Sequence, residues 1–300
     1  MADRLRALWD FGDLEASERR FRTALDEESS APARAELMTQ LARMEGLRGE
    51  FEAGEHLVEE AEQLAGDSVS ARVRIDLERG RLRRSSGDAA AALPLFERAC
   101  VTAVQAGELY LAGDAAHMAA LAAPDRDRST AWTERGIELA ESSDEARYWL
   151  GPLLNNLGWE HFEAAEHAEA LAAFERALAV REEDPGSPEP IALARYAVGK
   201  ALRALGRSEE AVPFVERAVA WAESEGAPDG WYHEELALEY AEFGRSDEAA
   251  EHARLAVPLL EEADPSFAED SERSAAPGSP SRMPRASACA PEMPVAYWNT

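Results

Sequence analysis

The sequence contains few cysteine, lysine and aromatic residues, and it lacks long apolar runs. Among 300 residues, Cys100 and Cys289 are the two cysteines, Lys200 is the single lysine, and aromatic residues make up 7%. Two distant cysteines offer no disulfide framework, and the first four residues lack the apolar character of a signal peptide. We therefore expect a reducing, cytoplasmic location. No apolar run is as long as a bilayer-crossing helix requires, so we also expect no membrane-spanning helix.

Positive charge is scarce as well. The chain has 31 basic and 59 acidic residues, a formal net charge of -28. A negative field of this size repels phosphate backbones and anionic lipid, which argues against nucleic acid and membrane surfaces as partners. What the chain does have is hydrophobic residues, 46%, with alanine especially frequent. Alanine is the strongest helix former, so this composition favours an all-α fold and disfavours a β-sandwich.

Sequence motifs of catalysis and metal binding are missing too. We find no glycine-rich phosphate loop, no Gly-x-Ser-x-Gly turn and no His-Glu-x-x-His. His161 and His167 are six residues apart, which places them on opposite faces of a helix rather than beside one metal ion. Cys100 has no nucleophile-activating partner in the sequence and is best interpreted as a packed thiol. We therefore expect a protein that is not an enzyme, with no catalytic residue, no cofactor and no metal site.

A repeat with a unit length of roughly 40 residues runs through most of the chain. The strings LFERA at 95–99, FERA at 174–177 and VERA at 215–218 each follow a turn residue at the same distance. Extending this register gives seven units. Their turn residues are Gly12, Gly49, Gly87, Pro124, Ala165, Gly206 and Gly244.

Residue size also repeats in this register. All seven units have a small residue five positions and twelve positions after the turn. Seven residues before the turn stand the small Ala42, Gly80, Gly158, Gly199 and Ala237, and nine residues after it stand the bulkier Phe21, Val58, Phe96, Phe174 and Val215. Small residues at fixed positions allow two helices to pack closely, so each unit is predicted to be a helical hairpin. One hairpin cannot bury its apolar face alone, which predicts an α-solenoid of about seven tandem hairpins.

These units resemble the tetratricopeptide repeat family. Leu157-Gly158, Ala170, Phe174 and Ala177 form the best copy, although the units are longer than is usual in the family and lack the early Trp and the closing Pro. The resemblance implies a right-handed superhelix whose first helices line a concave groove that takes peptides. We expect this solenoid to span residues 1–263.

Residues 264–300 differ in composition from the repeats. They contain six prolines and several serines, so we expect a disordered tail. Ser266 and Glu269 have the spacing of a capping box, which predicts a short capping helix near residues 267–275. Two alternatives stay open: a partner-binding motif around Tyr297 and Trp298, and an unusual reading-frame origin for the tail. The acidic residues 269–272 could also occupy the chain's own groove.

The first helix of each unit carries the candidate binding surface. Positions three, six and ten before each turn form a stripe about 120° from the packed face, which we call the first-helix stripe. It contains six basic and two acidic residues in a strongly acidic chain. As candidate peptide-binding residues we select Arg6, Arg43, Arg81, Arg84, Asn155, Asn156, Trp159, Phe162, Tyr196, Lys200 and Arg203.

Each part of the stripe has a functional and a structural interpretation. Arginines aligned at equivalent positions could bind carboxylates of an acidic ligand, or they could pair with nearby glutamates. If they are exposed, reversing Arg43 and Arg81 to Glu should leave the melting temperature unchanged. Trp159, Phe162 and Tyr196 could anchor apolar side chains, or the neighbouring hairpin could cover them. Asn155 and Asn156 could hold a ligand backbone.

Three functions fit these observations. The favoured one is a non-catalytic scaffold that binds a peptide segment of a partner protein in the concave groove. The alternative is a regulatory or sensor module that binds a small signalling peptide and acts through a separate DNA-binding partner. A third is self-assembly through an exposed apolar edge of the C-terminal hairpin at Leu255, Leu259 and Leu260.

Overall fold

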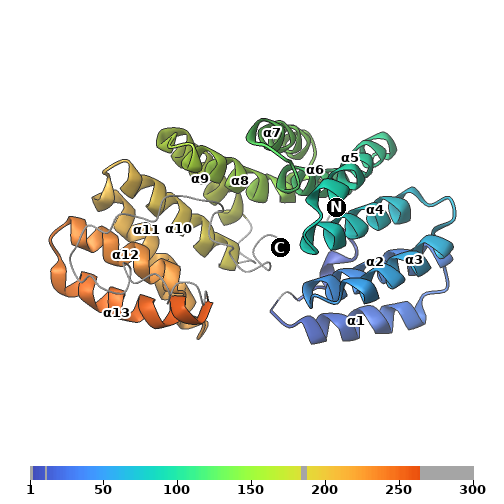
Figure 1. The fold of residues 1–300 in the computed structure, drawn as a ribbon, viewed down its shortest axis with the longest axis horizontal. Coiled ribbons are helices and arrows are strands. Elements are labelled where there is room, and N and C mark those ends of the chain that lie inside the picture. The colour runs from blue at the N-terminus through green and yellow to red at the C-terminus, as the bar shows by residue number, and fades with distance from the viewer. Residues whose placement is uncertain (1–2, 11, 184–187, 264–300) are drawn as a thin grey trace. The chain divides into compact units, whose positions relative to one another are not determined.

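A computed structural model describes residues 3–10, 12–183 and 188–263 of the chain. This described part contains thirteen α-helices and two short 3-10 helices, and it contains no strand. It divides into two compact units, which we describe separately: unit 1 ends at Leu153 and unit 2 begins at Leu154 (Figure 1). The expected tail at 264–300, with its capping helix at 267–275 and the Tyr297 and Trp298 motif, lies outside the described residues.

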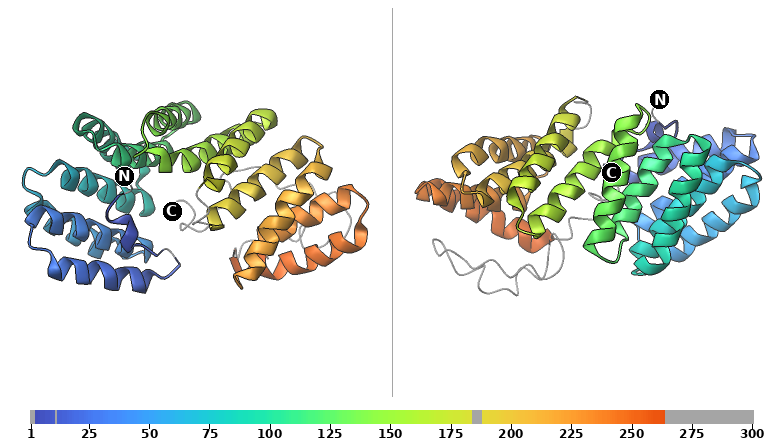
Figure 2. Two further views of the ribbon diagram at one scale, coloured as in Figure 1. Left: turned by 180° about the vertical axis from the view of Figure 1, so that it is seen from behind. Right: turned by 90° about the horizontal axis from the view of Figure 1, so that it is seen from above.

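Unit 1 contains three helix pairs, which follow η1 and α1. Its elements are η1 (Arg6–Leu8), α1 (Leu14–Glu27), α2 (Ala31–Leu47), α3 (Phe51–Ala65), α4 (Val69–Ser85), α5 (Ala89–Ala106), α6 (Leu109–Leu121), α7 (Arg126–Ser142) and η2 (Arg147–Trp149). α2 packs mainly on α3 and α4 mainly on α5, whereas α6 packs on both α5 and α7. Figure 2 shows these helices from two further directions. The all-α hairpin architecture that the repeat predicts is therefore confirmed.

Unit 2 continues the same pattern. α8 (Leu150–Glu163) crosses the boundary between the units and is followed by α9 (His167–Glu182), α10 (Pro188–Ala204), α11 (Ser208–Ser224), α12 (Gly230–Glu242) and α13 (Ser246–Ala263). α10 pairs with α11 and α12 with α13.

The first repeat departs from the expected hairpin. The described residues hold six complete helix pairs, but before α1 the chain forms only the three-residue η1 in place of a full first helix. The expectation of a regular first helix around Arg6 is therefore wrong. Residues 3–9 are instead held by side-chain contacts to later repeats, which are described below.

Five of the seven predicted turn residues adopt a left-handed backbone that suits a hairpin turn. Gly49, Gly87, Gly206 and Gly244 have φ between 71° and 93°, in the left-handed region that glycine enters without steric cost. Ala165 occupies the same place with φ 59° and is the one non-glycine residue with positive φ in the described part. These turns end the first helices at the positions that the register predicts.

Glycine on the first helices α4, α8 and α10 makes room for a bulky residue on the second helix. A Cβ atom added to Gly80 would lie 2.5 Å from the Phe96 ring, and one added to Gly158 would lie 2.3 Å from the Phe174 ring. Gly199 is equally close to Val215. The pairing of small and bulky positions read from the repeat is thus a close contact within these three hairpins.

The end of the last hairpin is less apolar on its surface than expected. Leu255 is 43% exposed, but Leu260 is buried against Ala256 and Trp231 within the pair formed by α12 and α13. The expectation that Leu255, Leu259 and Leu260 form one exposed edge is wrong for Leu260. Leu255 and Leu260 are five residues apart, about 140° around the helix, so they cannot both belong to one exposed edge.

Candidate functional site

The first-helix stripe lies on α2, α4 and α6 in unit 1 and on α8, α10 and α12 in unit 2. In unit 1, its arginines meet carboxylates. Arg81 on α4 is only 5% exposed and donates to Glu78 at 2.6 Å and to Asp114 on α6. Burial by itself would lower the pKa of Arg81, but the carboxylates of Asp114 and Glu78 raise it above its ordinary value. Of the two interpretations left open for the aligned arginines, the structure supports pairing with nearby acids for Arg81.

Glu78 is an acidic partner of Arg81 that the first-helix stripe does not include. It lies nine residues before its turn, one position outside the stripe, and it is buried. Burial raises its pKa, while the charges of Arg81 and Arg43 act in the opposite direction. The charge of the stripe therefore cannot be read from its own positions, because a neighbouring position supplies the balancing acid.

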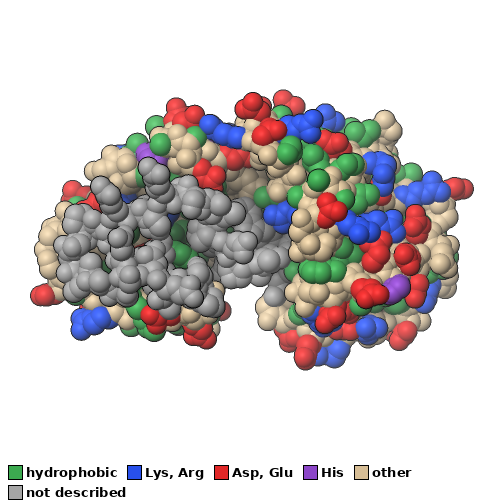
Figure 3. Space-filling model, in the orientation of Figure 1, with side chains coloured by type: hydrophobic (Ala, Val, Ile, Leu, Met, Phe, Trp, Pro, Cys, Tyr) green, Lys and Arg blue, Asp and Glu red, His purple; other side chains and the backbone are tan. Residues whose placement is uncertain are grey.

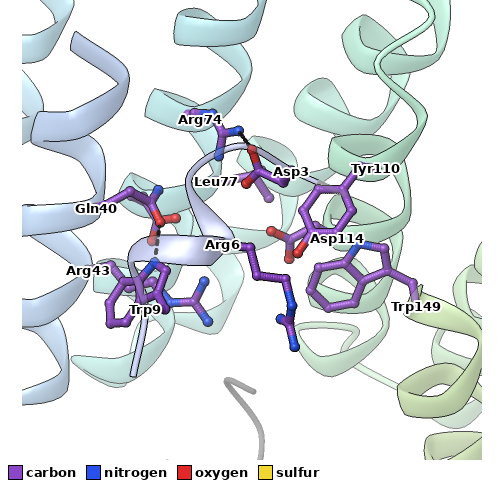
Figure 4. A pocket seen from close by; sticks show the side chains of 11 residues that line it. Asp3, Arg6, Trp9, Gln40, Arg43, Arg74, Leu77, Tyr110, Asp114 and Trp149 are labelled. Carbon is purple, nitrogen blue, oxygen red and sulfur yellow. Dashed lines mark hydrogen bonds and ion pairs between the residues drawn. The ribbon is translucent and has the colours of Figure 1, made fainter. Parts of the chain in front are cut away.

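Residues 3–9 cross the face that α2 and α4 present (Figure 4). The Asp3 carboxylate accepts a hydrogen bond from Arg74 Nη2 on α4 at 2.6 Å, and Arg4 pairs with Glu36 on α2 at 3.1 Å. Glu36 also lies 3.2 Å from Arg74 Nε, so the segment joins an ion-pair network that spans two repeats. The network is mostly buried, which makes each of its charges costly to leave unpaired.

Apolar and aromatic contacts hold the rest of this segment. Leu5 is 1% exposed and packs in a cluster with Phe21 of α1 and with Leu37 and Leu41 of α2. The indole Nε1 of Trp9 donates to Gln40 Oε1 at 2.9 Å. Residues 3–9 thus contact unit 1 through an acid, a leucine and an indole.

Arg6 and Arg43 stack on aromatic rings. The Arg6 guanidinium lies 3.8 Å from the centre of the Tyr148 ring, and the Arg43 guanidinium lies 5.3 Å from the centre of the Trp9 ring. Arg6 therefore belongs to the segment that covers the stripe rather than to a first helix. Burial lowers the pKa of Arg43, and the charge of Arg81 lowers it further.

The last candidate of unit 1, Arg84, is half-buried. Its Nε donates to the backbone oxygen of Leu121 at 3.3 Å, and burial lowers its pKa. His117 on α6 stacks against Trp149 at 5.5 Å between ring centres, and burial lowers its pKa to about 4. This histidine is therefore neutral at pH 7 and adds no positive charge to the face.

Little empty space remains beside these side chains. The cavity lined by Arg6, Trp9, Gln40, Arg43 and Tyr110, among others, has a volume of about 20 Å³. This volume holds about one water molecule. With residues 3–9 in place, the face of unit 1 has no room for a further peptide at this point.

In unit 2, part of the stripe is aromatic. Trp159 on α8 lies 5.6 Å from Phe162 and 6.5 Å from Tyr196 on α10, measured between ring centres, and Tyr196 lies 5.2 Å from Tyr232 on α12. We call these four residues the aromatic ladder. Tyr196 and Trp159 are buried and Phe162 is half-buried, so packing between hairpins covers much of the ladder, as one of the two interpretations predicts.

Lys200 and Arg203 of α10 share one carboxylate. Glu235 on α12 accepts from Lys200 Nζ at 3.3 Å and from Arg203 Nη2 at 3.1 Å. Burial would raise the pKa of Glu235, but the two cations outweigh it and hold this pKa below its ordinary value. Glu235 lies nine residues before its turn, the position of Glu78 in unit 1, so the same omission hid both acids from the sequence analysis.

Asn155 and Asn156 are both buried on α8. Within the described part of the chain, Asn155 Oδ1 and Asn156 Nδ2 have no hydrogen-bond partner. Buried amides are usually paired, so these two unpaired atoms are unusual, although the surrounding protein covers both of them.

Glu239 is another buried acid of unit 2. It is fully buried on α12, and neither carboxylate oxygen has a hydrogen-bond partner among the described residues. Burial raises its pKa to about 9, and the charge of Glu235 contributes in the same direction. Glu239 is therefore mainly a neutral acid at pH 7.

The described residues show neither a metal-binding cluster nor a membrane-spanning helix. They contain no group of three or more potential metal ligands, and Cys100 is a buried free thiol. None of their helices is both long and apolar enough to span a membrane. Over the part of unit 1 seen in Figure 3, acidic and basic side chains are interspersed, in keeping with ion pairs such as Arg79 with Glu55 and Arg98 with Asp76.

Two stretches, residues 153–183 and residues 192–225, match models of the tetratricopeptide repeat. None of the curated proteins compared matches the sequence. Among solved structures, the apo form of RapI is similar with a TM-score of 0.66 and 13% identity over 87% of this chain and 74% of RapI. BtubC from P. vanneervenii is similar with a TM-score of 0.58 and 19% identity over 75% of this chain and 93% of BtubC.

A Rap protein complexed with Competence and Sporulation Factor is also similar, with a TM-score of 0.53 and 14% identity over 90% of this chain and 76% of that protein. At these identities the solved structures establish the fold alone. The two matched stretches lie in a solenoid whose helical hairpins continue on both sides of them, so the chain is similar to the tetratricopeptide repeat at residues 153–183 and 192–225.

Proposed function

We propose that this chain is a non-catalytic interaction protein that binds a peptide segment of a partner protein on its first-helix stripe. A repeat protein of this family provides a surface for protein–protein interaction, and the proposal places the ligand on that surface. The observation that carries it is the aromatic ladder of unit 2, which connects three successive first helices. Aromatic side chains are enriched among the residues that dominate binding energy at protein interfaces.

The surroundings of the ladder suit a peptide backbone. The amide atoms Asn155 Oδ1 and Asn156 Nδ2 can accept from and donate to main-chain groups of a ligand, provided that the protein covering them moves aside when the ligand binds. Phe162 is half-buried at one end of the ladder and is the member best placed to gain burial when a ligand side chain packs on it. Apolar anchoring is therefore the main source of affinity in this proposal.

Charge contributes less than the sequence suggests. Glu235 is bound to both Lys200 and Arg203, so these cations are largely balanced before a ligand arrives. An acidic ligand side chain would have to share them with Glu235. We therefore expect a modest preference for acidic peptides, and a weak dependence of affinity on salt.

Photo-crosslinking tests this proposal directly. p-Benzoylphenylalanine is introduced in place of Phe162 in one variant and in place of Phe243 in a matched control, since Phe243 is 40% exposed near the end of α12 and outside the ladder. Both variants are irradiated in cells of the source organism, and the crosslinked peptides are identified by mass spectrometry.

We expect the Phe162 variant to crosslink one defined segment of a partner protein. The Phe243 variant should not crosslink that segment. Crosslinks from Phe243 alone, or the same crosslinks from both positions, would move the binding surface away from the ladder. The absence of any crosslink from Phe162 while the variant remains helical would contradict the proposal.

The same experiment addresses a second candidate function. A protein of similar fold, the Rap protein, is complexed with Competence and Sporulation Factor, so a regulatory module that binds a small signalling ligand is compatible with this architecture. A crosslink to a short free peptide rather than to a segment of a larger protein would favour that function.

A further inference from the structure

Residues 3–9 occupy the stripe of unit 1 in the manner of a bound peptide. Only three of these residues, Arg6–Leu8, form regular structure, a single 3-10 turn, and the principal contacts of the segment are with residues far along the chain. Asp3 reaches Arg74 across 71 positions of sequence, and Trp9 reaches Gln40 across 31 positions. An ordinary first helix would instead satisfy its own backbone and pack mainly on its hairpin partner.

From these contacts we propose that the face of α2 and α4 is a docking site for a peptide segment that carries a carboxylate, a leucine and an indole at the spacing of Asp3, Leu5 and Trp9, and that residues 3–9 are its resident occupant. The inference rests on the proposed peptide-binding function and adds a regulatory element to it. A partner segment with equivalent groups binds unit 1 by displacing residues 3–9.

The contacts define what such a partner must offer. A carboxylate is needed opposite Arg74, which Asp3 now supplies at 2.6 Å. A leucine-sized side chain two residues later fills the space among Phe21, Leu37 and Leu41, which Leu5 now occupies. An indole or similar donor four residues further on meets Gln40, as Trp9 does.

The charge of Arg74 explains why the occupant needs a carboxylate at the position of Asp3. Arg74 is buried and lies between Asp3 and Glu36. Burial would lower its pKa, but the carboxylate of Asp3 raises it above the ordinary value. Removal of residues 3–9 would leave a buried cation short of one carboxylate, so the vacated site favours an incoming acid over a neutral or basic group.

A resident segment on the same chain is a strong competitor. Tethering gives it an effective concentration in the millimolar range, so a ligand in trans binds weakly until the segment is released. Opening the site should therefore raise the affinity for a free peptide without any new contact.

The test uses a fluorescein-labelled, acetylated peptide with the sequence of residues 3–10, DRLRALWD, and the full chain. Leu5→Asp opens the site, because it introduces a charge into the apolar cluster. Ala7→Asp is the matched control, because Ala7 is exposed on the same segment. Fluorescence anisotropy gives the affinity, and circular dichroism confirms that each variant is folded.

We expect the Leu5→Asp chain to bind the peptide at least 10-fold more tightly than the wild type and the Ala7→Asp chain. Adding Arg74→Met to the Leu5→Asp chain should weaken binding about 10-fold, and a peptide that carries Asp3→Lys should fail to bind. Equal affinity for all three chains, or no binding to a folded Leu5→Asp chain, would show that residues 3–9 are a structural cap and overturn the proposal.

If the Leu5→Asp chain does not fold, hydrogen exchange on the wild-type chain provides a second test. Addition of about 1 mM unlabelled peptide should increase exchange of the amides of residues 4–9 if the resident is displaced. Unchanged exchange would overturn the proposal. Both readouts concern unit 1, whereas the crosslinking of Phe162 concerns unit 2, so either idea can fail while the other stands.

Discussion

The first-helix stripe is mainly charged in unit 1, whereas in unit 2 it combines aromatic residues with the two cations Lys200 and Arg203. Six residues before their turns, Arg43 and Arg81 stand in unit 1, whereas Trp159 and Lys200 stand in unit 2. In unit 1, buried carboxylates and residues 3–9 cover the stripe, and in unit 2 an aromatic ladder runs along it. One repeat register can therefore carry a charged, occupied face and an aromatic face, because hairpin closure depends on other positions of the helix.

The largest effect should come from breaking the charged face. Arg81→Met leaves Glu78 and Asp114 buried without their cation, which should cost about 3–5 kcal/mol in the free energy of unfolding of unit 1. Urea unfolding followed by circular dichroism measures this loss. Arg98→Met, which disturbs the more exposed pair with Asp76, is the control and should cost less than about 1 kcal/mol.

This outcome would also decide between the two interpretations of the basic stripe. An exposed arginine would give equal, small losses for Arg81→Met and Arg98→Met. Equal losses would mean that Glu78 and Asp114 are well solvated, which would contradict the buried charge network described for unit 1.

The next effect concerns the buried acid of unit 2 and its dependence on pH. Because the pKa of Glu239 is raised to about 9 in the folded chain, the folded state holds a proton that the unfolded state releases near pH 4. The stability that the protonated Glu239 contributes is therefore fully present below about pH 4 and is lost as the pH rises toward 9. Glu239→Gln should stabilise unit 2 increasingly over this window, by a few kcal/mol at pH 8.

Urea midpoints of the wild type and of Glu239→Gln at several values between pH 5 and pH 9 measure this difference. Glu248→Gln serves as the control, since the pKa of Glu248 is lowered, chiefly by its hydrogen bond with Arg245, and its contribution is already complete above about pH 5. A pH-independent gap between wild type and Glu239→Gln would show that Glu239 is ionised and solvated in the folded chain.

The smallest loss of stability should be similar in the two units. Gly80→Ala and Gly158→Ala each place a methyl group against a phenylalanine ring, which should cost about 1–3 kcal/mol through overpacking. Hydrogen exchange should show the loss in α4 and α5 for Gly80→Ala and in α8 and α9 for Gly158→Ala. Phe96→Leu, added to Gly80→Ala, should recover part of the loss by making room for the methyl group.

A loss of protection that spreads over the whole chain in either variant would show that the two units unfold together. Losses confined to one unit would show that each hairpin array is stabilised mainly by its own neighbours, as expected for a repeat protein.

Sequence spacing was enough to predict the hairpins but not the state of their polar residues. Gly80, Gly158 and Gly199 could be paired with bulky residues from the repeat alone, because backbone approach at a fixed register admits few side-chain sizes. Glu78 and Glu235 were missed because they lie one position outside the stripe, and long side chains reach across helices to partners that spacing does not reveal. Gly107, which ends α5 with φ 78°, was also missed, since the sequence there gives only one weak break.

The repeat, the turn positions and the family resemblance were determined by the sequence itself, since helix periodicity and the size of close-packed residues are local properties that recur from one unit to the next. Only the tertiary structure decided which charged residues of the stripe are neutralised and that residues 3–9 lie across α2 and α4 instead of forming a helix. These outcomes depend on side chains from different repeats meeting in a buried environment, where the cost of desolvation and the geometry of each ion pair are set by packing.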